Sequence, residues 1–124
     1  MIRLDTHVVV WLYAGEVERL SPVAAERLTT EELAISPIVE LELTYLHEIG
    51  RLTVTGAVVV ADLRERLGLA LSARHLASVV AAAAPLEWTR DPFDRLIVGD
   101  ALSANSALLT KDAVIRAHYP LAEW

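Results

Sequence analysis

Asp94 is the residue of this chain whose type and position most clearly suggest a role in binding or catalysis. Its charged side chain falls on the apolar side of a predicted helix. The helix that carries it starts at Asp91, which suits an N-cap, and Pro92, which suits the first turn. On a helical wheel, Asp94 lies on an apolar arc flanked by Phe93 and Ile97. A carboxylate there is costly to bury unless something pairs with it, and no basic residue occupies that arc. A metal ion shared with other carboxylates would satisfy it.

Glu42 shows the same conflict in an earlier helix. A serine followed by a proline predicts the start of that helix, which we expect over residues 37–49. Most of its apolar residues fall on one arc of the wheel, and Glu42 sits near the middle of that arc. Glu40 points almost the opposite way and is interpreted as solvated. Glu42 is therefore singled out by geometry and not merely by being acidic.

Two further carboxylates follow expected strands. Asp5 comes directly after a short apolar strand at 1–4, and Asp112 comes shortly after a buried-looking strand at 106–110. In a parallel sheet, sites form beyond the carboxyl ends of the strands. Four carboxylates converging there form an all-oxygen ligand set, which selects hard ions such as Mg²⁺ or Mn²⁺. Because Mg²⁺ keeps several waters, such a site has room for a phosphate and an attacking water, which is the chemistry of phosphodiester hydrolysis.

Short strands alternate with helices along the chain, which is typical of an α/β fold with a short parallel sheet between helices. We expect strands at 1–4, 33–35, 106–110 and, as a strand or connector, 68–71. We expect helices at 7–14 capped by Thr6, 22–32 capped by Ser21, 37–49, 56–67, 73–84 capped by Ser72, from 92 onward, and to about 118. No repeat, low-complexity tract or linker interrupts the pattern, so one domain over residues 1–124 is predicted.

The composition excludes several classes of protein. A net charge of −6 argues against a protein that coats nucleic acid by bulk electrostatics, although it permits an acidic centre that binds cations. The sequence has no cysteine, so disulfides are excluded and a cytoplasmic protein is expected. The longest apolar run, at 76–86, is too short to span a membrane.

The chain is unusually apolar for its length, with 54% hydrophobic residues among 124. The run from Val8 to Tyr13, together with Leu41, Tyr45 and Leu46, exceeds what a small core needs. We therefore expect another chain to cover part of this surface, as a dimer interface, a groove for a partner protein, or both.

Five short motifs resemble those of the PIN domain, in the same order and over nearly the whole chain. They are Asp5-Thr6-His7, Ser36 followed six residues later by Glu42, Gly50-Arg51-Leu52, Arg90 to Arg95, and Thr110-Lys111-Asp112. The Asp-Pro-Phe-Asp-Arg segment at 91–95 is the most specific of them. In detail the motifs are similar to those of VapC toxins of bacterial and archaeal toxin–antitoxin pairs. The chain departs from many relatives at Leu41, where they carry a tryptophan, and we interpret this position as packing.

This resemblance implies a PIN-like fold and a metal-dependent endoribonuclease that is usually a homodimer and is inhibited by a cognate antitoxin. It also implies that Asp5, Glu42, Asp94 and Asp112 form the catalytic acidic cluster and bind Mg²⁺ or Mn²⁺. A metal-bound water would attack an RNA phosphate in line. The apolar surface described above would be the dimer interface, the groove for the antitoxin, or both.

Six polar residues lie beside the expected ligands and are candidates for supporting roles. Three of them could orient a carboxylate or a metal-bound water by hydrogen bonding, namely Thr6, Ser36 and Thr110. The other three could contact RNA phosphates, namely Arg90, Arg95 and Lys111. Helix capping accounts equally well for Thr6 and Ser36, and Arg95 could instead meet an antitoxin carboxylate or lie in solvent.

Other readings stay open at this point. Asp112 also suits the N-cap of the helix that follows it, and a turn or cap role suits Asp5. A phosphoacceptor response-regulator domain is disfavoured, because Asp5 has no acidic neighbour and the middle of the chain has no aspartate before Asp62. A catalytically silent PIN-fold binding module is disfavoured by the presence of all four carboxylates. A PIN nuclease that processes RNA outside a toxin module is equally compatible with the motifs.

Overall fold

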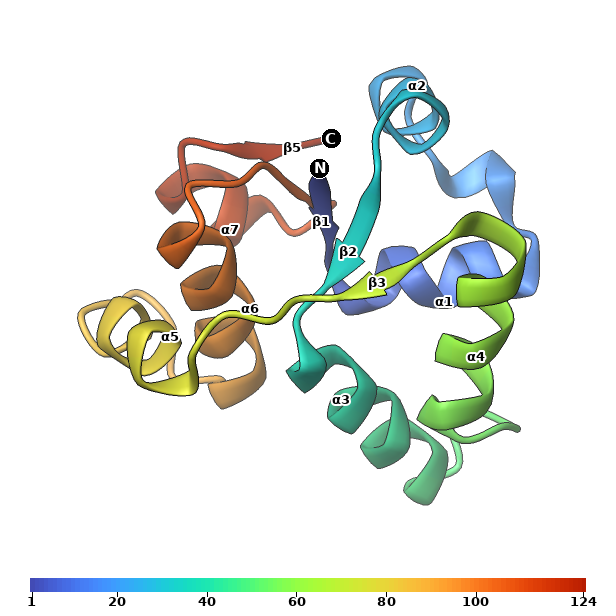
Figure 1. Cartoon of the computed structure of the whole chain (residues 1–124), viewed down its shortest axis with the longest axis horizontal. Coiled ribbons are helices and arrows are strands. Elements are labelled where there is room, and N and C mark those ends of the chain that lie inside the picture. The colour runs from blue at the N-terminus through green and yellow to red at the C-terminus, as the bar shows by residue number, and fades with distance from the viewer.

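A five-stranded sheet, parallel throughout, runs through the centre of the molecule (Figure 1). The computed structural model describes residues 1–124. Its strands are β1 (Ile2–Leu4), β2 (Leu33–Ile35), β3 (Ala70–Leu71), β4 (Leu108–Leu109) and β5 (Ala122–Glu123), and their order across the sheet is β3-β2-β1-β4-β5. The predicted α/β architecture, a short parallel sheet flanked by helices, is confirmed.

β1 is the central strand, and its position determines where a site can form. All of its residues are buried, and Arg3 pairs with Ala34 of β2 on one side and with Leu108 of β4 on the other. The chain builds the sheet outward from β1 in one direction through β2 and β3, and later in the other direction through β4 and β5. The order reverses at β1, so a crevice is expected beyond the carboxyl end of this strand.

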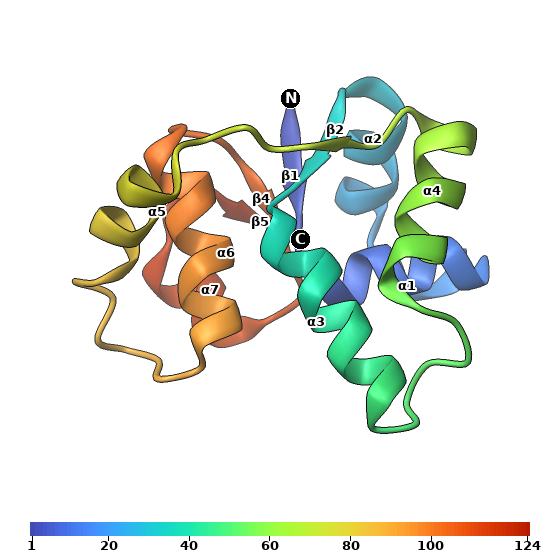
Figure 2. The same cartoon turned by 60° about the horizontal axis from the view of Figure 1, so that its bottom comes forward.

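The helices lie on both sides of the sheet. They are α1 (Thr6–Ala14), α2 (Pro22–Thr30), α3 (Pro37–Glu48), α4 (Gly56–Leu67), α5 (Leu76–Ala83), α6 (Pro92–Ser103) and α7 (Ala113–His118), with a short 3₁₀ helix, η1, at Val17–Arg19. Figure 1 shows α5, α6 and α7 on one side and α1, α2 and α4 on the other. Figure 2 shows α3 between α4 and α6, and it packs against both. No helix has the length and apolar character needed to cross a membrane.

Several helix starts follow from local sequence. Ser21, Ser36 and Asp91 are N-caps whose side chains accept backbone N–H groups, and each precedes a proline in the first turn, as predicted. Asp91 accepts two of these bonds, from the N–H of Phe93 at 2.8 Å and from that of Asp94 at 3.2 Å. The helix that carries Asp94 is therefore fixed at its first residue.

Other boundaries differ from the prediction. Asp5, not Thr6, is the N-cap of α1, because its carboxylate accepts the N–H of Thr6 at 2.8 Å. Ser72 does not cap α5, which begins only at Leu76 after a cap that makes no side-chain hydrogen bond. The N–H of Ser72 instead donates to the carbonyl of Ile35 at 2.8 Å and continues the pairing of β3 with β2. β5 was not predicted, since two residues give no periodic signal.

The apolar run at Val8–Tyr13 belongs largely to the core. Val8 and Val9 are fully buried, and Val10, Leu12 and Tyr13 pack against the core cluster. Of the apolar surface that was predicted to be covered by another chain, Leu41 and Tyr45 of α3 remain exposed, at 56% and 48%.

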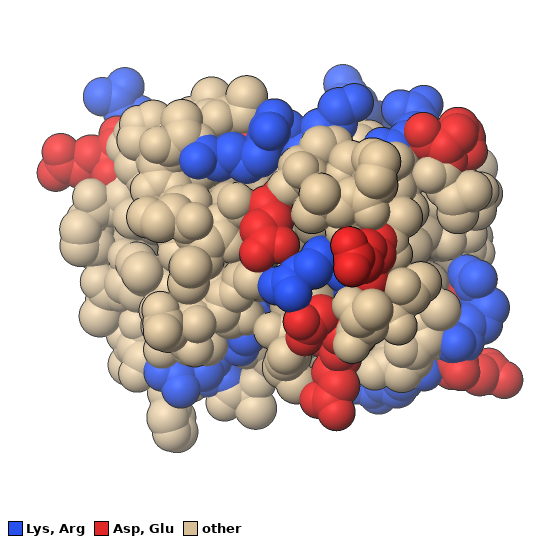
Figure 3. Space-filling model, turned by 90° about the horizontal axis from the view of Figure 1, so that it is seen from above, with Lys and Arg blue, Asp and Glu red and all other residues tan.

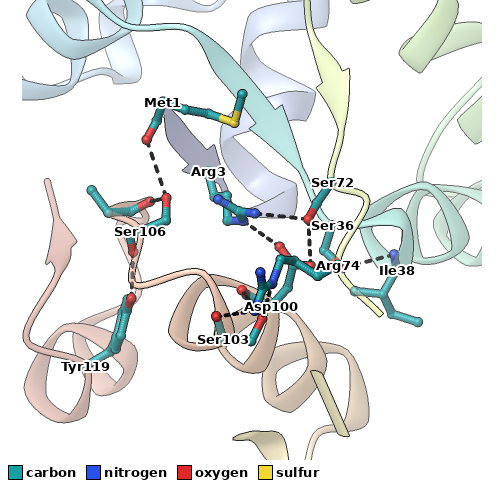
Figure 4. Close-up of polar contacts among 11 residues, drawn as sticks. Met1, Arg3, Ser36, Ile38, Ser72, Arg74, Asp100, Ser103, Ser106 and Tyr119 are labelled. Carbon is teal, nitrogen blue, oxygen red and sulfur yellow. Dashed lines mark hydrogen bonds and ion pairs between the residues drawn. The ribbon is translucent and has the colours of Figure 1, made fainter. Parts of the chain in front are cut away.

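A buried ion pair joins the central strand to α6 (Figure 4). Nε of Arg3 lies 2.5 Å from Oδ2 of Asp100, and the two residues are only 7% and 1% exposed. Ser72 completes the triangle: its hydroxyl accepts from Nη2 of Arg3 at 3.0 Å and donates to Oδ1 of Asp100 at 2.9 Å. The network therefore links β1, α6 and the end of β3.

Surface ion pairs tie the edge of the sheet to α2 on the face near both termini. Arg27 lies between Glu31, at 2.7 Å, and Glu123 of β5, at 2.9 Å. The amino terminus also pairs with Glu31, at 3.2 Å. Figure 3 shows basic and acidic side chains interspersed on this face, so it offers no continuous basic surface for nucleic acid.

The buried ion pair predicts a specific pattern of stability. Asp100→Asn should lower the free energy of unfolding in urea by about 3 kcal/mol, because it leaves the buried guanidinium of Arg3 without its counter-charge. The double variant Arg3→Met/Asp100→Leu should lose less than Asp100→Asn alone. The control, Asp62→Asn, breaks an exposed pair with Arg66 and should change stability little. Equal effects of Asp100→Asn and Asp62→Asn would contradict this role of the pair.

Candidate active site

The four predicted carboxylates line one pocket beyond the carboxyl end of β1. They come from four different places in the chain: Asp5 follows β1, Glu42 is on α3, Asp94 is on α6, and Asp112 precedes α7. The pocket has a volume of about 310 Å³. The fold therefore brings together side chains that are far apart in sequence, as the strand-end argument and the helical wheels indicated.

Asp5 is the most rigidly held of the four. It is 4% exposed, and each of its oxygens accepts a hydrogen bond. Oδ1 accepts the N–H of Thr6 at 2.8 Å, and Oδ2 accepts the hydroxyl of Thr110 at 2.7 Å. Nδ1 of His7 lies 3.5 Å from the same Oδ2. Thr110 thus orients Asp5, which is the supporting role that its position after β4 suggested.

Glu42 is half-buried, and it is held by the hydroxyl of Thr6, which donates to its Oε1. Burial raises the pKa of Glu42, and the hydrogen bond from Thr6 partly opposes that rise. The negative charges of Asp5 and Asp91 raise the pKa further. One threonine therefore contacts two of the four carboxylates, through its N–H to Asp5 and its hydroxyl to Glu42.

Asp94 carries the strongest perturbation in the pocket. Its pKa is raised from 3.8 to about 7, first by burial and then by the charges of Asp91, Asp5, Asp112 and Glu42, in that order. Every one of these causes acts in the same direction. The carboxylate conflict inferred from the helical wheel is thus present in the folded chain, and no basic residue of the chain relieves it.

Asp112 has two roles at once. Its Oδ1 accepts the N–H groups of Val114 at 2.8 Å and Ile115 at 3.0 Å, so the residue is the N-cap of α7. It also lines the acidic pocket. Because the cap uses only one oxygen, capping and ligation of a cation are compatible in the same side chain.

The donor set suits a hard divalent cation, although it does not form a closed cage. No three His, Asp or Glu side chains stand at the spacing of an assembled metal site. Mg²⁺ keeps several of its waters and takes only one or two carboxylates directly, so it suits carboxylates spread around an open pocket. Burial first, and then repulsion from neighbouring carboxylates, raise the pKa of Asp94 to about 7, and a bound cation would offset both by stabilising the ionised carboxylate.

The pocket also contains His7 and Arg51, to which no functional role was assigned from the sequence, and Trp11, which was predicted to belong to an apolar surface covered by another chain. Nε2 of His7 accepts the N–H of Lys111 at 2.9 Å, which requires an unprotonated Nε2, and burial lowers the pKa of the ring. Arg51 is the only Lys or Arg among the lining residues. The four-residue spacing of His7 and Trp11 places both on one face of α1, a signal that was available in the sequence.

Arg90 and Arg95 are not in the acidic pocket, which corrects their expected position. They line a separate hollow of about 250 Å³ between α5 and α6. The guanidinium of Arg95 donates to the carbonyls of Ala84 at 2.7 Å and Ala83 at 3.4 Å, the last carbonyls of α5. Although Arg95 is adjacent to Asp94, one step along a helix turns the side chain by about 100°. The side chain of Arg95 therefore caps the C-terminus of α5 and does not face the carboxylates.

Ser36 also lies outside the pocket. Its hydroxyl accepts the N–H of Ile38 at 3.3 Å as the cap of α3, and the residue lines a different, mainly apolar cavity of about 350 Å³. Of the six supporting candidates, Thr6, Thr110 and Lys111 are the ones in contact with pocket residues.

The chain is similar in sequence to a known ribonuclease over its whole length. It is 32% identical over 130 residues to ribonuclease VapC22 of Mycobacterium tuberculosis, with 99% of this chain and 98% of the relative covered.

Solved structures of related architecture show the same fold. VapBC2 from Rickettsia felis, bound to a DNA fragment from its promoter, superposes with a TM-score of 0.70 at 22% identity, covering 99% of this chain and 98% of that one. A toxin–antitoxin complex from Klebsiella pneumoniae gives 0.67 at 16% identity, covering 100% and 97%. A family model described as the PIN domain matches residues 2–119. On this match, and on the arrangement of the four carboxylates that it encloses, the chain belongs to the PIN domain family.

Proposed function

We propose that the chain is a metal-dependent endoribonuclease that hydrolyses RNA phosphodiester bonds with Mg²⁺ or Mn²⁺. The observation that carries this proposal is the convergence of Asp5, Glu42, Asp94 and Asp112 on one pocket, with the pKa of Asp94 raised to about 7. Unrelieved repulsion between carboxylates in a pocket is typical of a cation site. The resemblance to ribonuclease VapC22 supports RNA as the substrate.

Each residue has a distinct part in the proposed mechanism. The four carboxylates would hold the cation directly or through its waters, and the bound cation would supply charge neutralisation at the phosphate and a more acidic water. Thr110 and Thr6 fix the orientation of Asp5 and Glu42 through the hydrogen bonds described above. Arg51, the one basic side chain lining the pocket, is placed to contact a phosphate of the RNA.

The proposed cellular role is that of the toxin in a toxin–antitoxin module, acting on RNA in the cytoplasm and neutralised by a cognate antitoxin. The name of the sequence relative and the solved toxin–antitoxin complexes support this role. The exposed apolar side chains of α3, including Leu41 and Tyr45, supply a surface for an antitoxin or for a second copy of the chain in a homodimer.

Removing single carboxylates tests the catalytic role. Asp5→Asn and Asp94→Asn should each reduce Mg²⁺- or Mn²⁺-dependent cleavage of total RNA by about a hundredfold or more, because each removes a charge that positions the cation. Asparagine is also a good N-cap, so Asp5→Asn should preserve α1 and the circular dichroism spectrum. Cleavage products would be mapped on end-labelled RNA, with EDTA as the metal-free reference. The exposed variant Glu26→Gln is the matched control, and wild-type rates in both aspartate variants would refute the mechanism.

The pKa of Asp94 predicts how stability depends on pH without metal. Because folding raises this pKa from 3.8 to about 7, the ionised carboxylate increasingly disfavours the folded state as the pH rises from about 4 to about 7. Asp94→Asn lacks this penalty. In EDTA it should be more stable than wild type by about 1 kcal/mol at pH 8, after allowance for solvent screening, with little difference at pH 4.5.

Urea titrations at both pH values measure this difference, and Glu26→Gln should show no such change with pH. Added Mg²⁺ or Mn²⁺ should then raise the unfolding midpoint of wild type more than that of Asp94→Asn. A wild type that is as stable as Asp94→Asn at pH 8 in EDTA would show that burial and neighbouring charges do not disfavour the ionised carboxylate of Asp94.

A further inference from the structure

An aromatic cluster borders the acidic pocket on the side of α1. Trp11 and His7 line the pocket, with ring centroids 5.0 Å apart. Trp124, at the other end of the chain, lies 5.8 Å from Trp11 and 6.3 Å from His7 between centroids. His7 accepts the N–H of Lys111, and Trp124 packs against the core cluster, so the ring whose position needs a separate explanation is Trp11.

Trp11 is not held there by the core. Its neighbours in sequence, Val10 and Leu12, pack against the core cluster, whereas Trp11 belongs neither to that cluster nor to the side chains packed on it. A large ring that is partly exposed in a pocket, and not needed to fill the interior, is available for a ligand. By contrast, Trp88 packs against the core and stacks on His118, away from the pocket.

Two cations gather at the same ring. The guanidinium carbon of Arg19 lies 5.5 Å from the centroid of Trp11, and Nζ of Lys111 lies 5.9 Å from it. Both side chains are exposed. Nε of Arg19 also pairs with Oε2 of Glu16 at 2.5 Å, so the uncompensated positive charge at this ring is that of Lys111, which makes no ion pair within the chain.

The chemistry of this wall favours a nucleotide over a cationic protein side chain. An arginine or lysine from a partner would meet the like charge of Lys111, and Arg19 already has Glu16 as its counter-ion. A nucleobase is neutral and has a π-face that can stack on tryptophan, and a phosphate beside it would be attracted by Lys111. A base is free to stack in this way only when it is unpaired, which points to single-stranded RNA.

We propose that Trp11, supported by His7 and Trp124, is the stacking site for one unpaired nucleobase next to the phosphate at the acidic pocket, and that Lys111 contacts a flanking phosphate. This inference rests on the proposed ribonuclease function and names a part of the substrate that the same site reads. It makes Trp11 a substrate-binding residue, with no part in activating water.

The test measures RNA binding separately from cleavage. In the Asp94→Asn background, with Mg²⁺ present, Trp11→Leu should weaken binding of fluorescently labelled 12-nucleotide single-stranded RNAs of mixed sequence by about tenfold to a hundredfold in anisotropy titrations. Trp11→Phe keeps an aromatic ring and should lose less. The control Trp88→Leu should bind within twofold of its parent. Unchanged binding by Trp11→Leu would overturn the proposal.

A second measurement keeps the proposal testable should Trp11→Leu fold poorly. With Trp11 intact, bases would be removed one at a time from a bound RNA to leave abasic positions. One position should weaken binding by a factor similar to that of the tryptophan substitution, and in Trp11→Phe the same abasic position should cost less. RNA binding that is insensitive to every abasic position would overturn the stacking site.

The failure of this proposal can be distinguished from failure of the proposed function. If wild type cleaves RNA but neither Trp11 variant changes RNA affinity, the nuclease stands and the stacking site is wrong. If wild type neither cleaves nor binds RNA, both are wrong. If Trp11→Leu leaves RNA affinity unchanged but abolishes binding of a deca-arginine peptide, the wall recognises a protein cation, which also overturns the proposal.

Discussion

The buried pair of Arg3 and Asp100 is the interaction on which the geometry of the site depends. Arg3 lies two residues before Asp5 on β1, and Asp100 lies six residues after Asp94 on α6, so the pair joins the two elements that carry these carboxylates. Because both side chains are almost fully buried, α6 cannot slide along the sheet without leaving an unpaired charge in the interior. The contact of α6 with α5 resists the same movement, since a Cβ at Gly99 would lie 2.8 Å from the Cβ of Ala83.

The two ends of α6 thus differ in whether their carboxylates have a counter-charge within the chain. At its C-terminal half, the charge of Asp100 is fully compensated within the chain, whereas at its N-terminus Asp94 adds to charges that the chain leaves uncompensated. Threonine hydroxyls and helix N–H groups satisfy the other three pocket carboxylates in part. The ionised carboxylate of Asp94 therefore lowers the stability of the folded chain. A cation that binds there removes this cost, so its relief adds to the free energy of binding.

The parts of the molecule that could be predicted from sequence are those set by local rules. Cap-plus-proline pairs located helix starts such as Asp91, and helical periodicity singled out Glu42 and Asp94 without any knowledge of their partners. What could not be predicted depends on tertiary partners. Ser72 is a residue type that often caps helices, yet its hydroxyl hydrogen-bonds to both Arg3 and Asp100. Arg95 is next to a pocket residue in sequence, but the carbonyls that it binds belong to another helix.

The aromatic cluster of His7, Trp11 and Trp124 also depends on tertiary partners that the sequence does not reveal. It gives one side of the pocket a different chemical character from the acidic side. Spacing alone places His7 and Trp11 on one face of α1, but the cations and Trp124 that give this face its character come from η1 and from the C-terminal part of the chain. On the proposed function, the acidic wall repels a phosphate until a cation is bound, whereas the aromatic and basic wall attracts a nucleotide without one. Recognition and reaction would then differ in their dependence on metal: RNA can be held at the aromatic cluster before the carboxylates have a cation with which to act on it.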